Sequence, residues 1–318
     1  MPSSLAPIVL FAYQRPEHTR SVLDALLRNP QAGESDLIVF VDGPKSPADA
    51  VVTDAVCEMF KDLSGFNSVN VHRSSLNRGL AQSITEGVSK VVEEHGRVIV
   101  LEDDIVVSEC FLEYMNDALD IYQYDTNVAS IHGYAYPVDC PLPATYFLRG
   151  ADCWGWATWD RAWAKYNENG KELLEQLRRS NQRREFDFDG YASYTAMLRD
   201  QIRGVNDSWA VRWYASAFLA DMCTLYPGHT LVQNIGLDGS GRHCGVSDKY
   251  GARPYEGNIS VERIEVAELP AARDAFTEYF RSLRSDDGSA ARRLARRAAT
   301  YPVGRRLLSM LAGRPIGQ

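Results

Sequence analysis

Short apolar runs alternate with longer amphipathic stretches through the first 120 residues. The runs Ile8–Tyr13, Leu37–Val41 and Val98–Leu101 show no polar alternation, which is typical of strands buried on both faces of a sheet. Between them, Pro16–Arg28 and Gly79–His95 carry apolar residues at helical spacing. Gly96 directly follows the second helix and is expected to end it.

The elements in between complete the same alternation. A helix is expected over about 48–61, a short strand over Val69–His72, and an amphipathic helix capped by Ser108. This order predicts an α/β fold with a mostly parallel sheet and helices on both faces. Ligands of such sheets bind beyond the carboxyl ends of the strands. The polar residues expected at that edge are Arg15, Asp42 and the triplet Glu102-Asp103-Asp104.

The second half is less regular and richer in aromatic residues. Four tryptophans lie between positions 154 and 163, and Asp207–Asp221 has the composition of a buried helix. A glycine-rich segment then runs from Gly236 to His243. Composition changes near Ala267, after which we expect a helical, arginine-rich tail.

Composition and charge narrow the classes of function. The 318 residues are 45% hydrophobic and 24% charged, as in ordinary globular proteins. The net charge is −8, although the segment from Phe280 to the end carries +7. The remaining chain is therefore strongly acidic, which argues against general nucleic-acid binding.

The compartment is inferred from the cysteines and from the apolar runs. None of the six cysteines forms a CxxC pair, and no basic segment followed by an apolar run opens the chain. These features favour a cytoplasmic protein. The basic tail has the pattern of an amphipathic helix that could lie peripherally on the inner membrane face, or it is a solvated terminus.

The acidic triplet is the main candidate for chemistry. Consecutive carboxylates repel one another, so they are tolerated in water or around a cation. Mn²⁺ or Mg²⁺ suits a few carboxylates together with phosphate oxygens and water. The competing interpretation is a solvated loop. Dinucleotide, P-loop, zinc-protease and serine-hydrolase motifs do not occur.

Several segments in order resemble GT-A-fold glycosyltransferases, nearest the N-acetylglucosaminyltransferase I type and bacterial family 2-like sugar transferases. The resemblance covers about Pro7 to Gly245. The segments that carry it are Pro7–Arg15, Val41-Asp42-Gly43, Asn77–Leu80, Leu101–Asp104, Phe147–Trp156, Asn206–Trp209 and Gln233–Gly236 running on to His243.

The resemblance implies a GT-A (Rossmann-like) fold and an inverting, metal-dependent glycosyltransferase. Residues 1–130 would form the nucleotide-sugar-binding half, 131–266 the acceptor half, and 267–318 the basic helical tail. The donor would be a nucleoside diphosphate sugar, with UDP-GlcNAc favoured. The acceptor would be a glycan or lipid-linked molecule, in surface polysaccharide synthesis.

The resemblance also assigns roles to residues. Arg15, Asp42, Asn77 and Arg78 would contact the nucleotide. Glu102 and Asp103 would bind ribose and sugar hydroxyls. Asp104 would be the direct metal ligand, and His243 would be a second ligand of the metal. Asp207 is the candidate base, although an aspartate there is equally expected as a helix cap. Asp152 and Asp160 are reserve bases. Trp154 or Trp156 would stack on sugar, or both belong to the core.

Two other functions stay open from the sequence. A sugar-1-phosphate nucleotidyltransferase shares a similar sheet and acidic site, but the loop Ala12–Glu17 lacks the glycines usual there. The second alternative is a non-catalytic module that keeps the pocket to bind a glycan. Loss of acidic residues from the triplet would favour this alternative, whereas the triplet Glu102-Asp103-Asp104 is intact.

Overall fold

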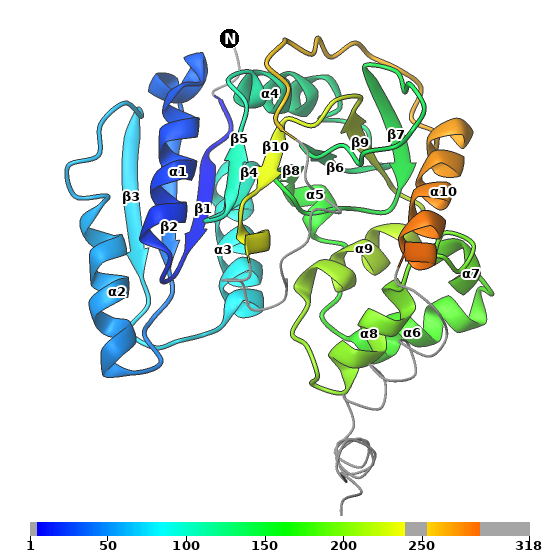
Figure 1. Ribbon diagram of the computed structural model, residues 1–318, viewed down its shortest axis with the longest axis horizontal. Coiled ribbons are helices and arrows are strands. Elements are labelled where there is room, and N and C mark those ends of the chain that lie inside the picture. Colours follow the sequence, from blue (N-terminus) through cyan, green and yellow to red (C-terminus); the bar gives the residue numbers. More distant parts are fainter. Residues whose placement is uncertain (1–4, 239–252, 287–318) are drawn as a thin grey trace, which may run out of the picture.

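An eight-stranded sheet forms the centre of the computed structural model, which describes residues 5–238 and 253–286 (Figure 1). The strand order is β3-β2-β1-β4-β8-β6-β9-β7. The strands are β1 (Ile8–Ala12), β2 (Asp36–Val41), β3 (Ser68–Arg73), β4 (Arg97–Glu102), β6 (Val128–His132), β7 (Thr145–Arg149), β8 (Trp156–Trp159) and β9 (Cys223–Pro227). A separate antiparallel pair joins β5 (Ile105–Val107) to β10 (Val232–Asn234).

Six of these eight strands run in the same direction. The pairs β1–β2, β2–β3, β1–β4 and β6–β9 are parallel, whereas β8 runs against β4 and β6, and β7 runs against β9. The predicted mostly parallel α/β sheet is therefore confirmed. The two reversed strands lie in the aromatic second half, where apolar periodicity carries no information on strand direction.

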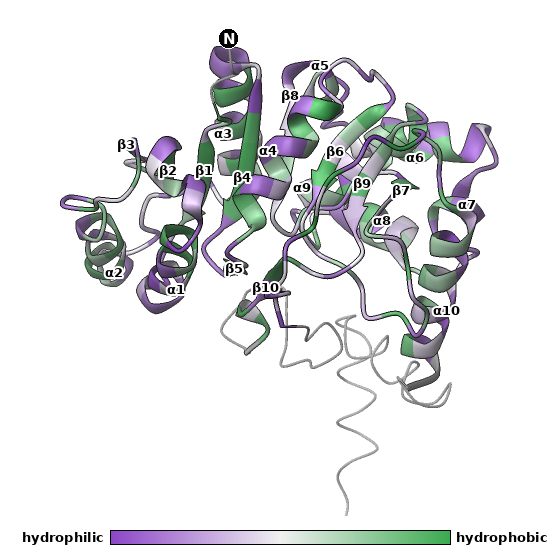
Figure 2. Ribbon diagram, turned by 90° about the horizontal axis from the view of Figure 1, so that it is seen from above, coloured by the Kyte–Doolittle hydropathy of each residue, from purple (hydrophilic) through white to green (hydrophobic). Residues whose placement is uncertain are grey.

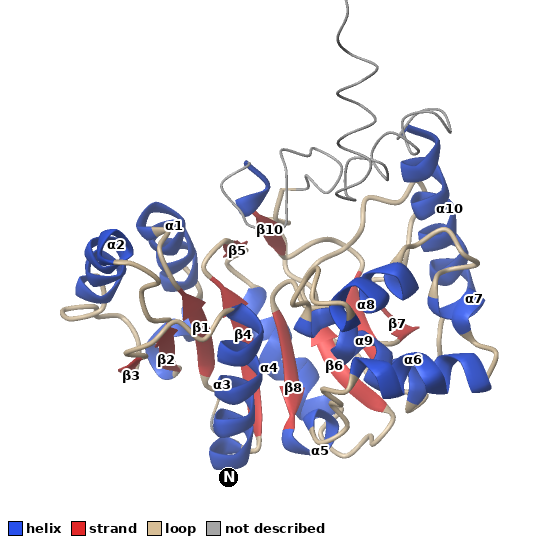
Figure 3. Cartoon of the chain, turned by 90° about the horizontal axis from the view of Figure 1, so that it is seen from below, coloured by secondary structure: helices blue, strands red, loops and turns tan. Residues whose placement is uncertain are grey.

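Helices cover both faces of the sheet. Figures 2 and 3 show α1 and α2 on one face and α3 and α5 on the other. In Figure 2 the strand β1 is largely hydrophobic, whereas the helices around it show both colours. The helices are α1 (Pro16–Leu27), α2 (Pro47–Glu58), α3 (Leu80–His95), α4 (Phe111–Ile121), α5 (Asp160–Trp163), α6 (Gly170–Arg179), α7 (Arg183–Phe186), α8 (Tyr194–Ile202), α9 (Trp209–Leu219) and α10 (Pro270–Asp286), with 3₁₀ turns η1 (Pro30–Glu34) and η2 (Gly236–Asp238).

The helix ends test two local predictions. Gly96 ends α3 in the left-handed region, with φ of 76°, and its N–H donates to the Val92 carbonyl at 2.8 Å, so that prediction is confirmed. The prediction for Ser108 is wrong. The cap residue of α4 is Cys110, which makes no side-chain cap, and Ser108 contributes only its carbonyl, to the Phe111 N–H.

A second apolar core lies beside the sheet, between α6–α9 and α10. Phe186, Phe218 and Phe276 are buried in it. Because Phe276 belongs to α10 and is 1% exposed, the packed chain continues past the predicted boundary at residue 267. The arginine-rich part of the predicted tail lies in 287–318, outside the described residues.

Within residues 5–238 and 253–286, no helix combines the length and the apolar composition needed to cross a membrane.

The packing of α10 predicts a large effect of truncating Phe276. Phe276→Ala should lower the free energy of unfolding by about 3–5 kcal/mol, because it leaves a cavity in the second core. Urea unfolding measures this. Glu278→Ala, at an exposed position of the same helix, is the control and should change stability by less than about 0.5 kcal/mol. Equal stability of the two variants would mean that α10 does not belong to the folded unit.

Candidate active site

The acidic triplet lies at the carboxyl edge of the sheet, directly after β4. Phe11 of β1 is in register with Glu102, so the loop after β1 lies beside the triplet. Nη2 of Arg15 is 2.5 Å from Oδ1 of Asp103, and Nη1 is 3.0 Å from Oδ2 of Asp104. The backbone N–H of Tyr13 donates to Oδ2 of Asp103 at 3.3 Å. One guanidinium therefore holds two adjacent carboxylates.

The triplet carries more negative charge than Arg15 neutralises. Burial, followed by the charges of Asp104 and Asp103, raises the pKa of Glu102 to about 8. Burial also raises the pKa of Asp103 to about 6, against the opposing charge of Arg15. Burial lowers the pKa of Arg15, but the charges of Asp103 and Asp104 raise it by more. The site is thus short of positive charge.

The turn after β10 closes over the same carboxylates. The Ile235 N–H donates to the Asp104 carbonyl at 2.9 Å. A Cβ at Gly236 would overlap Oδ2 of Asp104 and press on Nη1 of Arg15. Any other residue at position 236 would force the Asp104 carboxylate and the Arg15 guanidinium to shift, so glycine allows the backbone to approach this ion pair closely. The side chain of Asp104 is 14% exposed as a result.

A divalent cation would fit this site only if the protein supplied part of its ligands and a bound phosphate or water supplied the others. In the described part of the chain, no group of three His, Cys, Asp or Glu residues could hold a metal alone. Mg²⁺-type sites, however, use one or two carboxylates and take their other ligands from phosphate and water. Asp104 has one carboxylate oxygen that pairs with no described cation, and Glu102 feels the charge of Arg15 but forms no ion pair within 4 Å with a described residue. The donor set and the charge deficit both suit such an ion.

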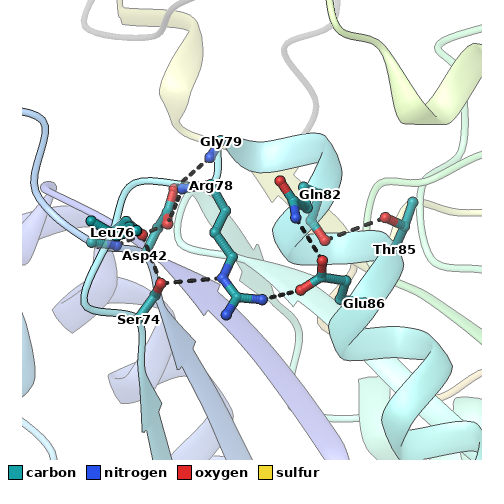
Figure 4. A network of polar contacts seen from close by, with 9 residues as sticks. Asp42, Ser74, Leu76, Arg78, Gly79, Gln82, Thr85 and Glu86 are labelled. Carbon is teal, nitrogen blue, oxygen red and sulfur yellow. Dashed lines mark hydrogen bonds and ion pairs between the residues drawn. The ribbon is translucent and has the colours of Figure 1, made fainter.

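Asp42, at the end of β2, anchors the loop before α3 (Figure 4). Oδ1 accepts from the N–H groups of Gly43 and Arg78, both at 2.8 Å. Oδ2 accepts from Nδ2 of Asn77 and the N–H of Gly79, both at 2.9 Å. These four hydrogen bonds bring Asp42, Asn77 and Arg78 together, as their predicted common role requires. Their contact with a nucleotide stays a prediction.

A cavity of about 270 Å³ adjoins this network. Its lining includes the stacked rings of Phe40 and His72, with Arg73, Arg78 and Lys90 as cations. The guanidinium of Arg78 bonds to Ser74 and Glu86, as Figure 4 shows. Asp42 and Glu86 also line the cavity, so it combines stacked rings with charges of both signs and can accept a planar, polar ligand.

Asp207, which precedes α9, is not the N-cap residue of this helix. Ser208 caps α9, because its hydroxyl accepts from the Val211 N–H at 3.2 Å. The side chain of Asp207 is 68% exposed and lies 3.7 Å from Nη2 of Arg212. A Cβ at Gly79 would be 3.9 Å from Oδ2 of Asp207. Asp207 thus lies next to the N-terminus of α3, and the alternative of a helix cap is wrong.

The reserve base Asp152 is held by hydrogen bonds. It accepts from the Tyr136 hydroxyl and the Cys153 N–H, both at 2.8 Å. Nε2 of His132 lies 3.6 Å from Asp152, and burial lowers the pKa of this histidine. Burial raises the pKa of Cys153, and the charges of Asp152, Glu102 and Asp104 add to this effect. The segment around Asp152 therefore adjoins the acidic triplet.

Two sequence predictions for this region are wrong. Trp156 is 1% exposed and stacks on Trp209 with ring centroids 5.5 Å apart, so it is a core residue and has no face free for a sugar. Asp160 follows β8, whose Trp159 pairs with Arg97 at the start of β4. Asp160 therefore lies at the opposite edge of the sheet from the triplet and is unsuited as a base. Trp154 is only partly buried and stays a candidate sugar contact.

Some residues of the site escaped the sequence prediction, and one predicted residue is not described. His132 and Tyr136 contact Asp152, but His132 is the last residue of β6 and Tyr136 lies in the segment after it, and neither belongs to a recognised motif. The one local signal for them is the alternation of tyrosines in Tyr134-Ala135-Tyr136. His243, the predicted second metal ligand, lies outside the described residues.

The anchoring role of Asp42 can be measured directly. Asp42→Ala should destabilise the protein by roughly 2–4 kcal/mol, because several loop donors lose their acceptor. Hydrogen exchange should become faster in residues 77–83 than elsewhere. Asp54→Ala is the control: Asp54 pairs with Arg73 at an exposed position and should cost less than about 1 kcal/mol. Unchanged exchange in residues 77–83 would contradict the role of Asp42.

Comparisons with known proteins give distant similarities. No protein-family model and no curated protein sequence matches the chain. TarS of S. aureus is similar over 70% of this chain and 36% of its own, with a TM-score of 0.37 and 12% identity. The mannosyltransferase PcManGT from Pyrobaculum calidifontis, in complex with GDP-Man and Mn²⁺, is similar over 98% of this chain and 88% of its own, with a TM-score of 0.33 and 11% identity.

Proposed function

We propose that this protein is an inverting glycosyltransferase that moves a sugar from a nucleoside diphosphate sugar to a hydroxyl of a glycan or lipid-linked acceptor. The observation that carries the proposal is the acidic triplet at the carboxyl edge of the sheet, with its charge only partly neutralised by Arg15. Ligands of α/β sheets bind at this edge. The sequence resemblance to GT-A enzymes points to the same residues.

The acidic site suits a diphosphate together with a divalent cation. Asp104, with Glu102 beside it, would hold Mn²⁺ or Mg²⁺ through the oxygens that Arg15 leaves unpaired. When bound, such an ion supplies positive charge that stabilises a departing diphosphate without proton transfer. Arg15 adds a fixed positive charge within 3.0 Å of Asp104. The cavity beside Asp42 is assigned to the nucleoside.

The chemical step is a single displacement. The acceptor oxygen forms a bond to the anomeric carbon while the bond from that carbon to the diphosphate oxygen breaks. The hydroxyl proton passes to Asp207, on the face opposite the leaving group. Asp207 is preferred to Asp152 because its carboxylate is exposed, whereas that of Asp152 already accepts two hydrogen bonds.

The finer assignments follow from the sequence resemblance alone. UDP-GlcNAc is the favoured donor, and surface polysaccharide synthesis is the favoured setting. A cytoplasmic enzyme with peripheral contact at the inner membrane face would suit a lipid-linked acceptor.

A donor panel tests the proposed function. Thermal-shift measurements with UDP- and GDP-sugars, with and without Mn²⁺, should show one donor that raises the melting temperature in a metal-dependent way. Release of the nucleoside diphosphate should accompany it when an acceptor is present. Formation of pyrophosphate from a nucleoside triphosphate and a sugar phosphate would instead indicate the nucleotidyltransferase. Glycan binding without any turnover would indicate the binding module.

Replacing Asp104 should remove the metal-dependent behaviour. Asp104→Asn should abolish both the metal-dependent thermal shift and the donor turnover, because the carboxylate charge is lost while the side-chain volume is kept. Asp24→Asn, on the exposed side of α1, is the matched control and should behave as wild type. Turnover by Asp104→Asn near the wild-type level would overturn the metal assignment.

Replacing Asp207 should affect the chemical step alone. Asp207→Asn should lower kcat by about 10²–10⁴-fold and leave the KM for the donor almost unchanged, since the base acts on the acceptor. Asp200→Asn, on α8 and paired weakly with Arg203, is the control. If Asp152→Asn lowers kcat and Asp207→Asn does not, Asp152 is the base and the assignment of Asp207 is wrong.

A further inference from the structure

A second cavity, of about 290 Å³, opens where α7, α8 and α10 meet. None of its lining residues belongs to the acidic triplet or to the residues that contact it. Four arginines line it: Arg183 and Arg184 of α7, Arg199 of α8 and Arg284 of α10. Asp187 is the one carboxylate among the lining residues. The cavity is therefore strongly basic within a chain that is acidic as a whole.

These arginines are poorly compensated. Among the side chains described in residues 5–238 and 253–284, Arg183, Arg199 and Arg284 have no ion-pair partner within 4 Å, and Arg184 lies 3.7 Å from Asp189. Oδ1 of Asp187 accepts from the Thr195 N–H at 2.7 Å. Arg183, Arg184 and Arg284 are exposed, so solvent screens part of their mutual repulsion, but four guanidinium groups around one small space still create a positive potential that attracts an anion.

Asp187 lies close enough to the arginines to be influenced by them. Burial raises the pKa of Asp187, while its hydrogen bonds to Thr195 and the charges of Arg199 and Arg284 act in the opposite direction. A single carboxylate cannot balance four guanidinium groups. Even when Asp187 is ionised, the four arginines give the cavity a net positive charge.

The wall of the cavity is held in a fixed shape. Phe188, Asp189 and Gly190 all adopt positive φ, at 46°, 55° and 87°. Such a conformation is strained for Phe188 and Asp189. Phe188 is anchored in the second core, 4% exposed, with its ring 5.1 Å from Phe280 and beneath the guanidinium of Arg273. A cavity that is rigid before binding loses little entropy when a ligand enters.

The chemistry of the lining selects phosphate. Guanidinium groups present paired N–H donors that match the oxygens of a phosphate group. The N-terminus of the nine-residue helix α8 faces the same space, because Ser193 and Thr195 belong to the lining, and it adds a partial positive charge. A volume of about 290 Å³ also leaves room for part of the molecule that carries the phosphate.

We propose that the cavity between α7, α8 and α10 is a binding site for a phosphate-bearing ligand, held by Arg183, Arg199 and Arg284. The phosphate belongs either to a free molecule or to a lipid headgroup, and both present the same oxygens. This site is separate from the proposed donor site and does not depend on transferase activity.

Binding of inorganic pyrophosphate by the full-length protein tests the proposal. Calorimetric titration is done in EDTA, so that a cation-mediated complex at the acidic triplet does not contribute. Wild type should bind saturably, and Arg199→Gln/Arg284→Gln should bind at least about tenfold more weakly, because two charge-assisted contacts are lost. The control is Arg178→Gln/Arg179→Gln on α6, which removes the same charge outside the cavity and should bind as wild type.

A second arm distinguishes the source of the phosphate. The same three proteins are sedimented with phosphatidylcholine vesicles with and without phosphatidylglycerol. Pyrophosphate binding that only the cavity variant loses supports a free phosphate ligand. Binding to phosphatidylglycerol vesicles that only the cavity variant loses supports a lipid headgroup. Pyrophosphate binding that is equal in wild type and the cavity variant, or no pyrophosphate binding and no vesicle binding by wild type, overturns the proposal. Vesicle binding of equal strength in all three proteins is assigned to the basic terminal segment, which is intact in each of them, and counts against a lipid headgroup in the cavity. Circular dichroism and melting temperature check that the variants are folded.

Discussion

The ion pair from Arg15 to Asp103 and Asp104 is the contact on which the carboxyl edge of the sheet depends. Asp103 is 4% exposed, and an isolated carboxylate at such a position would be costly to ionise. Arg15 offsets that cost and fixes the loop after β1 against the turn after β4. The turn at Gly236 then packs on the same ion pair, so segments more than 200 residues apart in the sequence meet at one charged contact.

A chain of polar contacts links this edge to the second half of the molecule. Asp42 binds the loop of Asn77 and Gly79, and Gly79 lies beside Asp207. The end of β2 therefore sets the position of the N-terminus of α3, against which the candidate base is placed. Removal of Asp42 would disturb the loop of Asn77 and Gly79 and, through Gly79, the surroundings of Asp207, although all four hydrogen bonds of Asp42 are to backbone and amide donors.

The second half combines an aromatic core with a basic surface cavity. Trp156, Trp209 and Trp213 pack together beneath the sheet edge, while Phe188 and Phe276 form part of the neighbouring core under α10. These rings hold the loop at Phe188 in a strained backbone conformation and thereby shape the arginine-lined cavity. The same packing that stabilises the fold thus keeps a cluster of like charges in place.

The sequence by itself determined the local elements and the presence of an acidic cluster at the carboxyl edge of the sheet. Unbroken apolar runs predict buried strands, Gly96 predicts a helix end, and three acidic residues after a strand predict a charged edge. Only the tertiary structure decided which polar residues meet. It made Ser208 rather than Asp207 the cap, buried Trp156, placed Asp160 at the opposite edge, and set Gly236 on Asp104. The reason is physical: periodicity and propensity depend on neighbours in sequence, whereas strand direction, side-chain burial and ion pairing depend on contacts between distant segments.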